Sequence, residues 1–293
     1  METLFLPLVN GLTWAMMVFL VASGLSLVFG VLKILNFAHG GFFMLGVYLT
    51  YTFIRNHALS PLKFFLIVFL CGIILAIIGA ILERLIIRRF YQLDEAYMLI
   101  ATYALLLVIE GSVEGIWGLQ FLALPSPKGL GGGTEIFNTI IPSYSLVIIA
   151  AGVAVAVLLN LLINRSPAGK IIRAAAGDPD MTSALGINVP IIYTMIFAFG
   201  IFLAAIGGGI GAPNQAITPT MASSFIIQAF GVVVVGGLGN IGGAFLAAII
   251  LGLVDSFGTI YLPQIPGIAF YAAMALILLV KPHGLFESSI STK

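Results

Sequence analysis

The chain contains apolar runs that are too long and too weakly charged for a water-soluble protein. Several stretches of 18 or more residues carry at most one charge, which is the length an α-helix needs to cross about 30 Å of hydrocarbon. Charged residues make up 8% of 293 positions, whereas soluble domains use roughly 25% to cover their surface. The runs are continuous rather than alternating, which excludes an outer-membrane β-barrel. The sequence therefore predicts one all-α, polytopic transmembrane domain, residues 1–293.

The apolar sequence divides into about eight segments, two of which are interrupted. Their approximate bounds are 5–32, 37–54, 63–87, 97–118, 142–163, 191–212, 224–254 and 265–281. Asn36-Phe37-Ala38-His39-Gly40-Gly41 precedes the second segment, and Gly236-Gly237-Leu238-Gly239-Asn240-Ile241-Gly242-Gly243 interrupts 224–254. Lipid cannot satisfy backbone groups that leave a helix, so such breaks persist only inside protein or beside a water-filled cavity. Short, glycine-interrupted segments are typical of a transporter's binding region.

Two interpretations of these breaks remain open. In the first they line a transport path and act as gates, because glycine permits more than one backbone conformation. The candidate path residues in the two breaks are Asn36, His39, Gly40, Gly41, Gly236, Gly237, Gly239 and Asn240. In the second they allow close helix packing, which is the favoured interpretation of the cluster at 207–211. The Asn36 and Asn240 amides are also placed to cap half-helices, and a cap suits His39 better than a proton relay.

The basic residues indicate which loops face the cytoplasm. Three groups stand between or after the spans, namely Arg84, Arg88 and Arg89, then Arg165, Lys170 and Arg173, and finally Lys281. The positive-inside rule places all three groups in the cytoplasm. A cytoplasmic Lys281 requires the interrupted segment 224–254 to double back as a re-entrant pair. The orientation of the N-terminus stays open, because Lys33 lies beside the first break.

The loop 165–190 has the pattern of two short helices at the membrane surface. Gly177 is placed to end the first helix, and Asp178 followed by Pro179 is a typical start for the second. Gly186 can then end the second helix. Alanine and leucine side chains would be exposed on this pair, which suits docking of another protein better than a lipid surface, since Trp and Phe are missing.

Two acidic residues fall inside the segment 97–118. Glu110 and Glu114 are four residues apart and so share one face of a helix. A carboxylate at the centre of a membrane costs roughly 2.5–3.5 kcal/mol on insertion scales, and it is by default a candidate functional group. Glu110 is therefore either a contact on the transport path or with a partner, or a protonated, hydrogen-bonded packing residue.

Motifs along most of the chain resemble one family. In order they are Asn36-Phe37-Ala38-His39-Gly40 with Phe43-Met44-Leu45-Gly46, Leu82-Glu83-Arg84, Ile172-Arg173-Ala174 through Ala184-Leu185-Gly186-Ile187-Asn188, Val235-Gly236-Gly237-Leu238-Gly239, and Lys281-Pro282-His283-Gly284-Leu285-Phe286. Each motif alone is modest, but in this order they resemble the LivH-type inner-membrane permeases of ABC importers for branched-chain amino acids. Glu110 departs from the family pattern, in which a neutral polar residue is more usual.

The resemblance implies a set of partners and a role for the loop 165–190. The partners would be two cytoplasmic ABC ATPases, a second related permease in the inner membrane, an extracytoplasmic solute-binding protein, and membrane lipid. In such importers a cytoplasmic loop docks in a cleft of each ATPase. The residues that the resemblance assigns to this coupling are Arg173, Ala174, Ala175, Gly177, Asp178, Ala184, Leu185, Gly186, Ile187 and Asn188.

The sequence carries no catalytic or cofactor motif of its own. Gly131-Gly132-Gly133 lacks the Gly-Lys-Ser/Thr of a phosphate-binding loop, and the three histidines have no metal-ligand spacing. No nucleic-acid-binding pattern is present either. We therefore expect no enzyme activity, cofactor or metal. Two alternatives stay open: a permease of the same family for urea or short amides, and a self-sufficient secondary transporter that uses Glu110 and Glu114 to bind a coupling ion.

Overall fold

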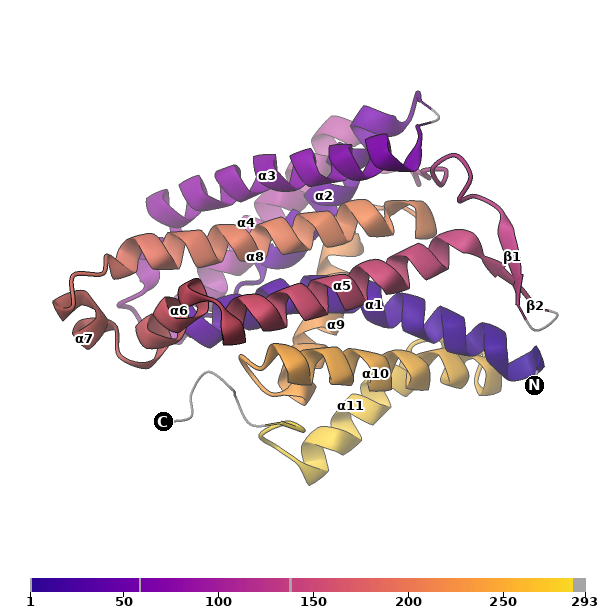
Figure 1. The fold of residues 1–293 in the computed structure, drawn as a ribbon. Coiled ribbons are helices and arrows are strands. Elements are labelled where there is room, and N and C mark those ends of the chain that lie inside the picture. Colours follow the sequence, from indigo (N-terminus) through magenta and orange to yellow (C-terminus); the bar gives the residue numbers. More distant parts are fainter. Residues whose placement is uncertain (1, 58, 137–138, 287–293) are drawn as a thin grey trace.

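A computed structural model describes residues 2–57, 59–136 and 139–286, and it confirms an all-α polytopic bundle (Figure 1). The helices before the long central loop are α1 (Glu2–Leu32), α2 (Ala38–Ile54), α3 (Pro61–Leu85), the 3-10 turn η1 (Ile87–Phe90) and α4 (Glu95–Trp117). A hairpin of β1 (Gly133–Ile136) and β2 (Thr139–Pro142) follows. The remaining elements are α5 (Ser143–Arg165), α6 (Pro167–Gly177), α7 (Pro179–Ala184), α8 (Val189–Gly211), η2 (Ala212–Asn214), α9 (Met221–Gly236), α10 (Ile241–Tyr261) and α11 (Ile268–Val280).

The predicted segments correspond closely to these helices. Six of them, α1, α3, α4, α5, α8 and α10, are long and apolar enough to cross a membrane, and α9 and α11 are shorter apolar helices. The interrupted segment 224–254 is indeed two helices, α9 and α10, separated by residues 237–240. The prediction of a break at this position is therefore confirmed.

Helix α1 forms the centre of the bundle, and 89% of its most apolar 18-residue stretch is buried. It packs against α5, α8, α9 and α10, and small residues set the closest approaches. A Cβ at Gly24 would lie 2.5 Å from the Gly200 carbonyl of α8, and one at Gly11 would lie 2.9 Å from the Gly252 carbonyl of α10. In lipid, helices associate through such close backbone packing rather than through the hydrophobic effect. The neighbouring α2 and α8 also pack closely at a glycine, because a Cβ at Gly208 would collide with the Phe43 carbonyl. This contact confirms the packing interpretation of the 207–211 cluster.

The basic loops gather at one end of the bundle, where Figure 1 shows α6 and α7 on the left. Arg88 in η1 donates to the Pro190 carbonyl at the start of α8, which links the first basic region to the end of the second. Beyond Lys281, the Leu285 N–H donates to the Val235 carbonyl, and a Cβ at Gly239 would touch Gly30 near the end of α1. The positive-inside rule predicts that this end is cytoplasmic, and we call it the cytoplasmic end. Since α1 runs toward it, the same rule now predicts an extracytoplasmic N-terminus, which the sequence left open.

The opposite end is covered by connecting segments that bond to one another. Leu122 and Ile217 exchange backbone hydrogen bonds as an antiparallel bridge, and the Lys128 N–H donates to the Leu59 carbonyl. These contacts join the connections that follow α2, α4 and α8. The β1–β2 hairpin lies beside them, near the N-terminus in Figure 1. The extracytoplasmic end is therefore a fixed cap on the helices.

Candidate transport path and coupling loop

The first break turns the chain back into the interior of the bundle. Lys33 has a positive φ of 56°, and the chain re-enters beside α1, so that the His39 Nε2–H donates to the Val21 carbonyl at 3.1 Å. Val21 lies 11 residues before the end of α1 at Leu32, a distance of about 16 Å at 1.5 Å per residue. Helix α2 therefore begins deep in the membrane. The break itself spans residues 33–37, and the predicted interval 36–41 is right only for Asn36 and Phe37, because Ala38 to Gly41 already belong to α2.

We predicted that the polar side chains of this break cap a helix, and this prediction is wrong. Asn36 and His39 are 1% and 0% exposed, and α2 has no side-chain cap. The His39 ring instead braces the middle of α1, because it reaches across to Val21 rather than to its own helix end. Both amide atoms of Asn36 lack a hydrogen-bond partner within the described residues. A buried unpaired amide costs about 1–3 kcal/mol, and such groups occur where function requires them.

Aromatic rings close the bundle next to Asn36. Phe37 stacks on Phe230 of α9 with ring centroids 6.3 Å apart, and it meets Tyr103 of α4 edge-on at 6.2 Å. On the cytoplasmic side of these rings lies a pocket of about 450 Å³, whose lining includes Lys33, Glu95 and Phe230. The pocket and a small void at Asn36 share Leu35 and Phe230 as walls. The rings therefore separate an inner vestibule from the interior, as a closed gate would.

Glu110 belongs to the same region as the first break. Its carboxylate is half-buried on α4 and accepts a hydrogen bond of 2.6 Å from the Ser223 hydroxyl of α9. A Cβ at Gly40 would lie 2.5 Å from the neighbouring Ala222 carbonyl, and one at Gly41 would lie 2.9 Å from Ile109. Gly40, Gly41 and Glu110 thus lie where α2, α4 and α9 meet, and Asn36 borders α9. His39 lies on the other side, between α1 and α8. The sequence did not indicate a role for Ser223, Phe37, Tyr103 or Phe230, because only the fold brings these residues together.

The second break is a packed turn, and its Leu238 lines the same pocket as Lys33 and Leu35 of the first break. Gly237 has a φ of 101° and faces the Phe286 carbonyl so closely that a Cβ would collide with it. Gly236 packs against Gly243 and Ala244 across the turn. The Asn240 Oδ1 accepts from the Gly243 N–H at 2.9 Å, which confirms the predicted cap of α10. Gly236, Gly237, Gly239 and Asn240 do not line that pocket, and their role in a path stays a prediction.

The packing of Gly237 makes a testable prediction. Gly237→Ala adds a Cβ against the Phe286 carbonyl and places an L-residue at positive φ, whereas Gly242→Ala adds a Cβ in ordinary contact with Asn240 at 3.5 Å. We expect Gly237→Ala to lower the melting temperature of the detergent-solubilised protein, and Gly242→Ala to leave it nearly unchanged. Equal melting temperatures of the two variants would contradict the assignment.

The loop 165–190 forms the predicted helix pair at the cytoplasmic end. Asp178 begins α7, and its Oδ1 accepts from the Met181 N–H at 2.9 Å. Gly186 ends the unit with a φ of 85°. Met181 and Leu185 are 61% and 75% exposed, so the apolar face is available to a partner. The helix boundaries predicted at Gly177, Asp178 and Gly186 are confirmed.

The residues predicted to couple this loop to a partner differ in their exposure. Those on the surface are Ala174, Gly177, Asp178, Ala184, Leu185, Gly186 and Asn188. Ala175 is fully buried, and Arg173 is half-buried, with its guanidinium donating to the Ile163 carbonyl at the end of α5. Ile187 is half-buried, and Asn188 caps α8 by accepting from the Ile191 N–H. Any coupling role of Ala175 and Arg173 would therefore be through packing within this chain.

An ion pair between buried Glu83 and half-buried Arg88 joins α3, η1 and α8 beside this loop. Glu83 is 0% exposed, and Arg88 donates to it from Nε at 3.1 Å and from Nη2 at 3.0 Å. Tyr91 donates to Oε1 of Glu83 at 2.9 Å, and Thr194 of α8 donates to Oε2 at 2.8 Å. Burial raises the pKa of the Tyr91 phenol, and the Glu83 carboxylate raises it further, so the hydroxyl stays protonated as a donor. We call these four residues the α3–α8 clasp.

The α3–α8 clasp was missed by sequence analysis, which used Glu83 and Arg88 only as parts of a motif and of a basic cluster. Within the described residues it contains the single salt bridge of the chain. A signal was present in the sequence. Glu83 lies 11 positions before the next acid, Asp94, and it stands close to Arg84, Arg88 and Arg89. Thr194, however, lies 111 residues from Glu83 and could not be paired with it in advance.

Comparison with known proteins identifies the family. Residues 8–280 match the family model described as the branched-chain amino acid transport system permease component. The chain belongs to this family. It is 30% identical to the permease protein BraD of Pseudomonas aeruginosa over 95% of this chain and 94% of that protein. It is 28% identical to the permease protein LivH of Escherichia coli K12 over 94% of this chain and 93% of that protein.

A solved structure shows a looser likeness, to PsaBC from Streptococcus pneumoniae in complex with Fab. The TM-score is 0.48 at 13% identity, over 92% of this chain and 89% of that one. The family membership and the six long apolar helices make this chain a multi-pass protein of the inner membrane. The resemblance that the motifs indicated is confirmed.

Proposed function

We propose that this chain is the membrane-spanning subunit of an ATP-driven importer of branched-chain amino acids. The observation that carries the proposal is the rigid helix pair α6–α7 at the cytoplasmic end, with Met181 and Leu185 exposed for a partner. Family membership and the names of BraD and LivH, both high-affinity branched-chain amino acid permease proteins, support the substrate class. Because the 293 residues hold no phosphate-binding loop, two separate cytoplasmic ATPases would supply the energy.

The transport cycle would work by moving one end of the bundle. An ATPase that grips α7 would displace the start of α8, because only Leu185 to Asn188 connect the two helices. The α3–α8 clasp would carry that displacement to α3, since Thr194 and Glu83 are hydrogen-bonded. Two alternative packings of the helices would then open and close the rings of Phe37, Tyr103 and Phe230. An extracytoplasmic binding protein would deliver the solute to the other face.

Helix α4 is the surface that we assign to a second permease. Glu114 is exposed on it, and nothing lies within 4 Å of a Cβ at Gly111 or at Gly115. Glu114 lies in the last turn of α4, so its carboxylate can face a partner or the aqueous boundary at little cost. Small residues four apart allow the close approach of another helix. A second copy or a related permease would therefore complete the path between itself and the α2–α4–α9 region.

Reconstitution tests the proposal. The chain would be co-expressed with the permease, ATPase and binding-protein genes of its own operon, and the purified complex would be placed in proteoliposomes. We expect ATP-dependent uptake of radiolabelled leucine, with unlabelled valine and isoleucine competing. Uptake of urea or acetamide in place of leucine would overturn the substrate assignment. Leucine uptake that continues without the ATPases would instead indicate a secondary transporter.

The coupling role of the loop makes a second prediction. Gly186 has a φ of 85°, which a β-branched residue adopts only with strain, whereas Gly177 has no positive φ and open space around it. Gly186→Val should displace Leu185 and reduce uptake in proteoliposomes while ATP hydrolysis continues. Gly177→Val should reduce uptake much less. If both variants transport at the wild-type rate, α7 does not carry the coupling.

A further inference from the structure

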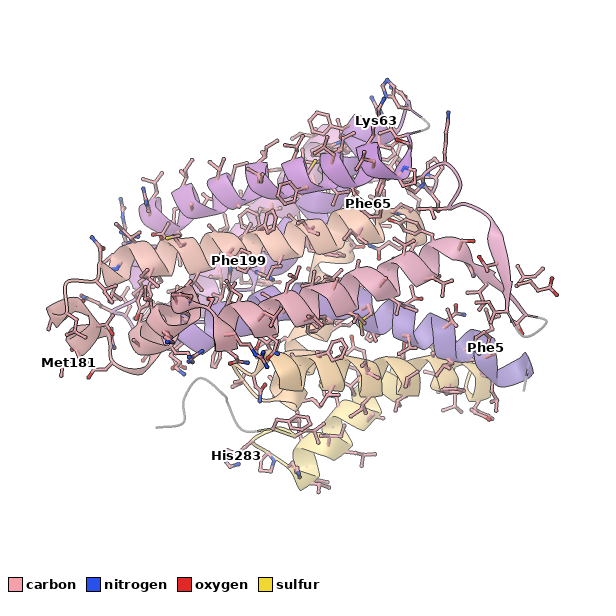
Figure 2. All side chains as sticks on the ribbon, viewed as in Figure 1. Phe5, Lys63, Phe65, Met181, Phe199 and His283 are labelled. Carbon is pink, nitrogen blue, oxygen red and sulfur yellow. The ribbon has the colours of Figure 1, made fainter. Side chains whose placement is uncertain are left out.

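An apolar groove runs along the membrane-facing side of α3 and α8. It has a volume of about 860 Å³, and its floor includes Leu27 of α1. Its other walls are Phe69, Ile73, Ala76, Ile77 and Ala80 of α3, Ile192, Met195, Ile196, Ala198, Phe199 and Phe202 of α8, Leu162 of α5, and Ala168, Ile171 and Ile172 of α6. Figure 2 shows Phe199 on this face of α8. All of these side chains are apolar, so the groove suits hydrocarbon and not the solute.

The groove has the length and the depth of one membrane leaflet. On α3 it extends from Phe69 to Ala80, a rise of about 16 Å at 1.5 Å per residue. That is about half of the roughly 30 Å hydrocarbon core. It ends beside Ile171 and Ile172 of α6, which lies at the cytoplasmic end. The groove therefore faces the inner leaflet.

Two arginines stand at the cytoplasmic mouth of this groove. Arg84 is four residues beyond Ala80 and so continues the lining stripe of α3 by one turn. Arg165 is three residues beyond Leu162 on α5, on the other side of the groove. Both are exposed, and neither forms a salt bridge or hydrogen bond within the described part of the chain. Unpaired guanidinium groups at this depth meet the phosphates of lipid headgroups.

We propose that this groove binds an anionic phospholipid of the inner leaflet, with an acyl chain along α3 and α8 and the headgroup phosphate at Arg84 and Arg165. The apolar lining supplies binding energy without selecting a headgroup. The arginines supply the selection, because a zwitterionic headgroup carries no net charge for them to neutralise. Ala76, Ala80 and Ala168 provide the space, since larger side chains there would fill the groove. The inference does not depend on the transported solute.

The test measures lipid retention by the purified full chain. The protein would be titrated in detergent with phosphatidylglycerol or with phosphatidylcholine of identical acyl chains, and bound lipid would be counted by native mass spectrometry. We expect the wild-type protein to prefer phosphatidylglycerol. Arg84→Gln and Arg165→Gln should each reduce that preference about fivefold, which corresponds to about 1 kcal/mol for one basic residue at a headgroup. Arg55→Gln, at the extracytoplasmic end, should leave it unchanged.

A second variant tests the acyl-chain seat separately from the headgroup. Ala80→Phe fills the groove without changing charge, and it should weaken binding of both lipids at this site. The proposal is overturned if the Arg84→Gln/Arg165→Gln double variant keeps its preference for phosphatidylglycerol, or if Ala80→Phe retains lipid like the wild-type protein. It is also overturned if a cysteine at Ile77 cross-links to a partner permease in native membranes, because the occupant would then be protein.

Discussion

Replacing Arg88 with alanine is expected to reduce uptake about tenfold or more in the reconstituted complex, while the ATPase subunits continue to hydrolyse ATP. The variant leaves the Glu83 carboxylate buried with hydrogen bonds from Tyr91 and Thr194 but without a counter-charge. Removal of one partner from a fully buried ion pair costs roughly 3–5 kcal/mol, and the cost here is smaller because the Arg88 side chain is 36% exposed. Since Arg88 also donates to the Pro190 carbonyl and to Thr194, the start of α8 keeps only the Thr194–Glu83 hydrogen bond of these links to α3. A push on α7 would then move α3 much less.

Two further variants separate coupling from folding. Arg89→Ala removes the adjacent arginine, which is exposed and makes no ion pair in the described residues, so transport should be unaffected. The double variant Glu83→Met/Arg88→Met removes both charges, which often restores the stability that a single removal costs. We expect it to recover the melting temperature without recovering uptake per ATP hydrolysed. If uptake and ATP hydrolysis recover together with stability, the α3–α8 clasp holds the fold and does not transmit movement.

The sequence was sufficient to predict the fold class because the bilayer imposes few solutions. Length and lack of charge give the spans. The glycine cluster at 236–243 contains the second interruption, residues 237–240, whereas Gly40 and Gly41 lie in the first turn of α2, just after the first interruption at 33–37. The helix boundaries in the loop 165–190 were predicted to the exact residue because the signals that set them are local. Asp178, Pro179 and Gly186 act on the next few peptide units, so no long-range contact was needed.

The location of the candidate site could be predicted only in part. The two breaks look alike in sequence, but Asn36 is buried beside Leu25 of α1 and Ile226 of α9, whereas Gly237 packs on the chain near Phe286. Which break faces a path depends on the neighbouring helices, and a glycine pattern does not contain that information. The predicted cap by Asn36 was wrong, since α2 begins without a side-chain cap and the Asn36 amide makes no hydrogen bond within the described residues.

The contacts that close the path were also beyond reach of the sequence alone. Glu110 was identified as a candidate because a carboxylate in an apolar run is unusual, but its partner Ser223 is 113 residues away. Phe37, Tyr103 and Phe230 are ordinary membrane residues until the fold brings their rings together. An energetically unfavourable residue can therefore be identified from one sequence, whereas the neighbours that give it its function cannot.

Glu110→Leu is expected to keep or raise the melting temperature of the purified protein while reducing uptake about tenfold or more. The two interpretations of Glu110 predict opposite combinations. A protonated packing residue contributes a hydrogen bond with Ser223, and its loss would lower stability by about 1 kcal/mol and leave transport intact. A path residue is retained in spite of a cost of roughly 2.5–3.5 kcal/mol, so replacing it with leucine relieves that cost.

Matched variants make the distinction at this position sharp. Glu110→Gln keeps a hydrogen-bond acceptor for Ser223 and removes the charge, so it reports the charge alone; Ser223→Ala removes the donor and keeps the carboxylate. Glu114→Gln changes the second acid of the same helix face, which is exposed and lies one turn further along α4. If uptake requires the carboxylate, Glu110→Gln should fail like Glu110→Leu, and Ser223→Ala should retain most of the rate. Full transport by Glu110→Leu together with a lowered melting temperature would instead assign Glu110 to packing between α4 and α9.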